Sequence, residues 1–162
     1  MESKISSSIR IDFLKDLPPR KFDVVGSFGF VEHFTNLREV LSRHVELVNE
    51  GGYVVIGVPN FRWGQYLIRL VLDRKTLNRH NLDAMKCGLI RKILTELGAK
   101  EIIYSGYYKT FKIWTDREDL PRMILRGIIL FDAVFQKLAR LVRADNIPSR
   151  FFSPYSVTIA KF

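Results

Sequence analysis

The sequence contains little cysteine and no long apolar run, and each absence excludes a class of protein. A single cysteine, Cys87, cannot form an intramolecular disulfide framework or a cysteine-rich zinc site. The most apolar stretches, such as residues 127–135, fall short of the roughly 18 residues that a membrane-spanning helix needs. The first eight residues lack the apolar core of a signal peptide. We therefore expect a soluble, intracellular and cytoplasmic protein, with peripheral contact to a membrane left open.

Acidic residues are scarce as well, since 17 Asp and Glu stand against 26 Lys and Arg, for a net charge of +9. This charge is compatible with nucleic acid, anionic lipid or an acidic substrate. Nucleic acid is the weaker choice, because the basic residues are scattered along the chain and no nucleic-acid-binding motif occurs. Glycine-rich loops are also missing: the ten glycines never adopt the spacing G-x-G-x-G or G-x-G-x-x-G.

The patterns that are present predict one α/β domain over residues 1–162. Runs of apolar and β-branched residues predict strands at 9–14, 22–27, 53–58, 100–108 and 155–162. Helical spacing of apolar residues predicts helices at 31–48, 62–73, 82–97 and 120–142. Gly51-Gly52 would end the first helix and Gly98 the third. The alternation of strands and helices favours a mostly parallel sheet.

The segment 22–60 carries an ordered set of motifs. A strand with Phe-Asp-x-Val is followed by Glu32-His33, a helix, Gly51-Gly52, an apolar strand and Pro59-Asn60. This combination resembles the middle of class I S-adenosylmethionine-dependent methyltransferases, in the subgroup that modifies small molecules, lipids and quinone-type compounds. The resemblance implies a Rossmann-like sheet with helices on both faces. In it, Tyr155–Phe162 would be an antiparallel last strand, inserted between the two strands before it.

The resemblance begins only at the third strand of that family. The glycine-rich cofactor loop after the first strand and the acidic residue on the second strand have no counterpart here. We therefore expect a partial, N-terminally truncated domain in which the strand at 22–27 is an exposed apolar edge. Three outcomes stay open: Ile9–Phe13 pairs with this edge, a partner chain or second copy covers it, or the isolated chain is unstable.

The resemblance implies methyl transfer from S-adenosylmethionine to a small-molecule or lipid-like acceptor, and assigns the site residues. Cofactor contacts would come from Asp12 and Phe13 at the adenine, from Ser27, Phe28 and Gly29 at the methionine end, and from Glu32. Asn60 and Trp63 would bind the substrate, and His33 is a candidate general base because imidazole titrates near neutrality. The structural alternatives are that Glu32 is a favourable acid in a first helical turn, that Asp12 is solvated, and that Phe28 is core.

Two further features bear on function. His44 and His80 stand apart from one another and from any H-E-x-x-H spacing, so no metal site is predicted. Residues 61–80 and 115–150 are basic and aromatic, and we expect lid or cover helices there. The helix at 120–143 joins a basic arc to a broad apolar face, which is also typical of helices that lie on anionic membranes. A non-catalytic methyltransferase remnant that binds a partner or a membrane surface is therefore the alternative function.

Overall fold

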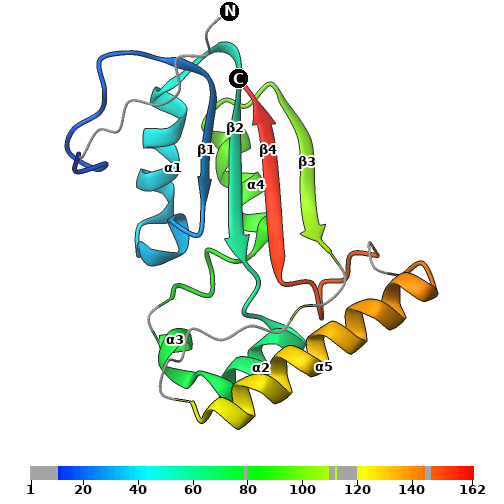
Figure 1. The fold of residues 1–162 in the computed structure, drawn as a ribbon. Coiled ribbons are helices and arrows are strands. Elements are labelled where there is room, and N and C mark those ends of the chain that lie inside the picture. The colour runs from blue at the N-terminus through cyan, green and yellow to red at the C-terminus, as the bar shows by residue number, and fades with distance from the viewer. Residues whose placement is uncertain (1–10, 79, 110–111, 113–119, 145–146) are drawn as a thin grey trace, which may run out of the picture.

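The computed structural model describes residues 11–78, 80–109, 112, 120–144 and 147–162 (Figure 1). The elements follow one another as β1 (Phe22–Phe28), a 3-10 turn (Val31–His33), α1 (Leu37–Glu46), β2 (Val48–Pro59), α2 (Trp63–Leu72), α3 (Arg74–Asn78), α4 (Cys87–Glu96), β3 (Glu101–Tyr108), α5 (Arg122–Leu141) and β4 (Tyr155–Lys161). The predicted α/β class is confirmed. No helix in the described part of the chain combines the length and the apolar character needed to cross a membrane.

The four strands form one sheet in the order β1-β2-β4-β3. β1 runs parallel to β2, whereas β4 is antiparallel to both β2 and β3. The predicted insertion of an antiparallel last strand between the two strands before it is thus confirmed. The carboxyl ends of β1, β2 and β3 lie at one edge of the sheet, and α2, α3 and α5 lie beyond that edge (Figure 1).

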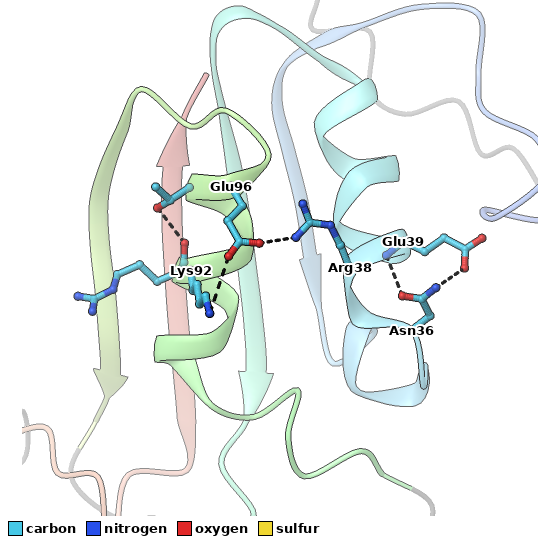
Figure 2. Close-up of polar contacts among 7 residues, drawn as sticks. Asn36, Arg38, Glu39, Lys92 and Glu96 are labelled. Atoms are coloured by element: carbon cyan, nitrogen blue, oxygen red, sulfur yellow. Dashed lines mark hydrogen bonds and ion pairs between the residues drawn. The ribbon is translucent and has the colours of Figure 1, made fainter.

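One face of the sheet packs against α1 and α4 and forms the main core. Its buried side chains come from alternate positions of β2 and from the apolar stripes of the two helices: Leu37, Val40, Leu41, Val54, Ile56, Val58, Ile90, Ile93 and Leu94. On their outer sides the helices are joined by the ion pair between Arg38 and Glu96 (Figure 2). Asn36 caps α1, since its side chain accepts a hydrogen bond from the Glu39 N–H at 3.3 Å.

The opposite face of the sheet is rich in exposed aromatic side chains. Phe28 is 66% exposed and Tyr108 is 55% exposed. Together with Tyr104, Tyr155, Val157 and Ile159 they line an open apolar cavity of about 500 Å³. β1 is the edge strand, and Val24 in its centre is 60% exposed. The expectation that a partner chain or a second copy covers residues 22–27 stays a prediction.

The strand predicted at 9–14 is wrong for its described part. Residues 11 and 12 are irregular, and Phe13–Lys15 form a turn, while residues 9 and 10 lie outside the described residues. Asp12 causes the turn: its carboxylate accepts the Leu14 N–H at 3.2 Å, and its carbonyl accepts the N–H of Lys15 at 2.9 Å. An Asp side chain that bonds its own backbone in this way competes with strand pairing. Within the described residues, this segment therefore leaves the outer edge of β1 unpaired.

The helix predicted at 31–48 is also wrong in its bounds, because the chain breaks after His33 and restarts at the Asn36 cap. β2 already begins at Val48, so Gly51-Gly52 lies inside a strand rather than at the end of a helix. Phe22 pairs with Val48 but Val24 pairs with Tyr53, so the intervening residues of β2 form a bulge. The other predicted glycine cap is confirmed: Gly98 follows α4 with φ of +99°.

Candidate functional site

The turn that follows β1 places two polar side chains at the carboxyl edge of the sheet. Gly29 leaves the strand with φ of +65°, and its N–H donates to the Gly57 carbonyl of β2 at 2.9 Å. Glu32 is buried, at 1% exposure, whereas the next residue, His33, is exposed. Ligands of open α/β sheets bind at this edge, so the position of both side chains agrees with the predicted site.

The fold brings His80 to the same place, a contact that no sequence spacing had indicated. The Asn81 N–H donates to the Glu32 carbonyl at 2.8 Å, and the Asn81 side-chain amide donates to the Phe34 carbonyl at 3.0 Å. These bonds hold the segment after α3 against the turn after β1. The rings of His33 and His80 consequently lie 4.6 Å apart between centroids.

The electrostatics of Glu32 are unusual for a carboxylate. Burial raises the pKa of Glu32, while a bond to its own backbone N–H and the nearby His33 and His80 act in the opposite direction. Its Oε2 atom is buried and has no hydrogen-bond partner in the described part of the chain. A buried carboxylate oxygen without a hydrogen-bond partner is costly, so this side chain is suited either to hold a proton or to bind a positive group.

Two of the predicted cofactor residues, Phe13 and Ser27, line one cavity of about 410 Å³ along the outer edge of β1. The Phe13 ring packs against Phe30 at 5.5 Å and against His44 at 4.8 Å between centroids. The Ser27 Oγ atom is buried and meets no hydrogen-bond partner among the described residues. The cavity thus combines aromatic walls with one unsatisfied hydroxyl, but its role as a cofactor site stays a prediction.

The structure places two other predicted cofactor contacts, Asp12 and Phe28, away from this cavity. Asp12 is on the surface, where its Lys15 partner at 3.2 Å lowers the pKa of the carboxyl. Phe28 projects from the opposite face of the sheet, because successive side chains of a strand alternate, and it lies over Gly57. A Cβ atom at Gly57 would come within 2.3 Å of the Phe28 ring, so only glycine leaves room for this arrangement.

The predicted substrate residues both contact the segment before β4. Asn60 is 0% exposed, and its side-chain amide donates to the carbonyls of Ser153 at 2.8 Å and Arg150 at 3.1 Å. Trp63 is 45% exposed and packs against Phe151 at 5.3 Å, with the Arg150 guanidinium 5.1 Å from its ring centroid. Asn60 therefore anchors this segment, whereas Trp63 presents an aromatic surface beside it.

We predict that His44 stays neutral when the pH falls through the ordinary range of histidine titration. Burial lowers the pKa of His44 from 6.5, and its Nδ1 lies 2.8 Å from the Val40 carbonyl. The unfolded chain then binds the proton more readily than the folded chain. The free energy of unfolding should therefore decrease as the pH falls below about 6.5. Urea denaturation between pH 7.5 and 5 measures the decrease, and a His44 ring resonance that titrates at or above pH 6.5 would contradict it.

Comparison with known proteins identifies the fold. No family model and no curated protein matches the sequence. Solved structures do match: a SAM-dependent methyltransferase from Archaeoglobus fulgidus, at 24% identity over 97% of this chain with a TM-score of 0.56. A SAM-dependent methyltransferase from Thermotoga maritima, described as a possible histamine N-methyltransferase, matches at 10% identity over 91% of this chain with a TM-score of 0.57. A putative methyltransferase from Bacillus halodurans matches at 15% identity over 91% of this chain, with a TM-score of 0.51.

The described sheet, with its inserted antiparallel strand, therefore has the Rossmann-like fold of class I methyltransferases. The chain covers 66%, 60% and 72% of the lengths of these three structures. A fold of this kind hosts many activities, so the function has to be argued from the residues at the carboxyl edge of the sheet.

Proposed function

We propose that this chain takes part in S-adenosylmethionine-dependent methyl transfer, of the EC 2.1.1 type, to a small-molecule or lipid-like acceptor. The observation that carries the proposal is the fold, a sheet β1-β2-β4-β3 with an antiparallel β4 that matches a solved SAM-dependent methyltransferase with a TM-score of 0.56. The turn with Gly29 and Glu32 lies at the sheet edge where ligands of this fold class bind.

The residues of this chain fit one side of such a site. The backbone at Gly29, which carries no side chain, and the Ser27 hydroxyl, which has no hydrogen-bond partner among the described residues, suit the methionine end of the cofactor. The cofactor supplies an activated methyl group when bound. Methyl transfer depends mainly on in-line positioning of the acceptor and the methyl group. We assign the positioning of the acceptor to Trp63 and the helices beyond the sheet edge. His33 is exposed at the carboxyl edge of the sheet, and in the absence of a bound cation it can accept a proton from the acceptor. A glycine-rich loop is absent from the sequence, so we propose that the chain alone holds the cofactor weakly.

Titration of the purified chain with S-adenosylhomocysteine, followed by calorimetry, tests the proposal. We expect saturable binding that Gly29→Ala weakens by about tenfold, which corresponds to ~1.4 kcal/mol. The added Cβ would be strained at this positive φ and would lie 3.6 Å from Glu32 Oε1, at the site. Gly98→Ala is the matched control, because Gly98 also has positive φ but follows α4, at the amino end of β3.

Both substitutions should cost similar stability, about 1 kcal/mol, because each places an alanine in a left-handed conformation. Only Gly29→Ala should change the affinity. Absence of binding heat in a sample with a cooperative unfolding transition would rule out cofactor binding by this chain. An equal loss of affinity in both variants would instead show that the effect is one of stability.

The second candidate function is a non-catalytic, membrane-surface-binding module, and α5 is the observation that favours it. Within this helix the buried hydrophobic side chain is Ala139, while large apolar side chains are exposed along its length. They include Met123, Leu130, Val134, Leu138 and Leu141. Arg122, Arg126, Lys137 and Arg140 flank this apolar surface and complement an anionic lipid headgroup layer. Sedimentation with anionic vesicles tests this function.

A further inference from the structure

We propose that Glu32, His33 and His80 form a binding site for a zinc-class divalent cation. The potential ligand atoms of these three residues all lie within 4.8 Å of one another. They come from two separate parts of the chain, the turn after β1 and the segment after α3, which meet at the carboxyl edge of the sheet. The inference rests on this geometry and does not depend on the proposed methyl transfer.

The donor set has the chemistry of a cation site with an open position. Two imidazole nitrogens and one carboxylate oxygen bind Zn²⁺ at about 2.0–2.2 Å, and three protein ligands leave a fourth position for water or an acceptor group. Ligand atoms around such an ion are roughly 3.3 Å apart by tetrahedral geometry. In the structure these atoms lie within 4.8 Å of one another, so they would move closer together around a bound ion.

The state of Glu32 is an independent observation that points to a cation. Its side chain is 1% exposed, and within the described residues Oε2 has no hydrogen-bond partner although it is buried. A ligand nitrogen of each imidazole lies within 4.8 Å of a Glu32 carboxylate oxygen, so a cation bound among these atoms would be close enough to compensate the carboxylate. A bound cation would compensate the buried Glu32 carboxylate, with one ring nitrogen of each histidine completing its ligand set.

Hydrogen bonds fix the backbone around the three residues of the proposed site. The Asn81 N–H and side-chain amide donate to the carbonyls of Glu32 and Phe34, so the residue next to His80 is tied to the middle of the 3-10 turn and to the residue that follows it. The His80 ring also packs edge-on against Phe61, with centroids 5.2 Å apart. These contacts hold the segment with His80 against the turn that carries Glu32, and preorganised ligands bind metals with less loss of entropy.

Titration of the untagged full chain with Co²⁺ tests the site, because cobalt bound to nitrogen and oxygen ligands absorbs visible light and Zn²⁺ should displace it. We expect one equivalent of bound cation. Loss of a residue that only hydrogen-bonds to a metal ligand typically weakens metal binding about 10- to 100-fold. Glu32→Gln, His33→Ala and His80→Ala each remove a ligand and should weaken cation binding at least that much. Asp83→Asn is the control, since Asp83 is exposed and close in sequence to His80 but pairs with Lys86.

The three histidines provide a second readout in the unmodified chain. Addition of Zn²⁺ should shift the ring resonances of His33 and His80 and leave those of His44 unchanged, because His44 is buried on α1 and bonds to Val40. Metal-free Glu32→Gln should unfold at least as cooperatively as the unmodified chain, so lost binding cannot be ascribed to misfolding. Absence of a cobalt spectrum, or an equal loss of cation affinity in Asp83→Asn, would overturn the proposal. Neither result would bear on cofactor binding, which the calorimetric titration tests separately.

Discussion

Replacing Arg69 by methionine is expected to lower the free energy of unfolding by about 3–5 kcal/mol. The Arg69 and Asp73 side chains are 1% and 3% exposed, and Nη1 lies 3.5 Å from the Asp73 carboxylate. The guanidinium also lies 4.5 Å from the centre of the Phe61 ring, so its removal affects packing as well as charge. Methionine fills most of the volume but leaves the buried Asp73 without this cation.

The exposed pair on α4 provides the control. Lys92 and Glu96 are also four residues apart, at 3.9 Å, but their side chains are 72% and 41% exposed (Figure 2). Lys92→Met should change the stability by less than about 1 kcal/mol, because solvent screens surface pairs. Urea denaturation of both variants at pH 7 gives the comparison, and Arg69→Met/Asp73→Leu should recover part of the loss. Equal losses in the two single variants would contradict the difference that burial predicts.

Membrane binding through α5 should decrease by more than tenfold in Leu130→Glu. Leu130 is 66% exposed in the free protein, so the substitution removes no core contact and should barely change stability. On a vesicle, however, the same leucine would enter the interface and contribute about 1.5–3 kcal/mol of apolar burial. The loss of affinity therefore reports insertion of the helix and is separate from folding.

Ala133→Glu is the matched control, because it makes the same charge change at an exposed position among the basic residues of α5, where no large apolar side chain is lost. It should weaken vesicle binding only through electrostatic repulsion, by about 1 kcal/mol for one charge near an anionic surface. Cosedimentation with vesicles containing phosphatidylserine, compared with phosphatidylcholine alone, measures both effects. Failure of the unmodified chain to sediment with anionic vesicles, or equal losses in the two variants, would exclude insertion through this surface.

The sheet was largely predictable from the sequence, whereas two local features were not. The uninterrupted apolar run of residues 53–58 and the alternation in 155–161 identify strands whatever surrounds them. The prediction of one helix over residues 31–48 was wrong. The spacing of apolar residues reflects the buried sides of the 3-10 turn and of α1, but it does not show the break between them. The alternation around Ile11 and Phe13 predicted a strand, but Asp12 bonds to its own backbone and turns the chain.

The candidate site was predictable only where it is local in sequence. Glu32 and His33 follow directly from the motif after β1 and stand at the sheet edge as expected. His80 was missed because its position depends on two hydrogen bonds from Asn81 to distant carbonyls, and no residue spacing records such bonds. The exposure of α5 was not predictable either, since an amphipathic pattern looks the same whether its apolar side meets a core or solvent.

The position of β4 between β2 and β3 has a consequence for the order in which this sheet forms. β2 and β3 share no ladder in the described sheet, and both bond to β4 instead. Until Tyr155–Lys161 is in place, the chain holds only the β1-β2 ribbon and a solitary β3, and two-stranded ribbons are marginal in water. On a ribosome the sheet would therefore remain open until synthesis has passed β4. Its closure is a late, long-range event in which one strand joins both halves.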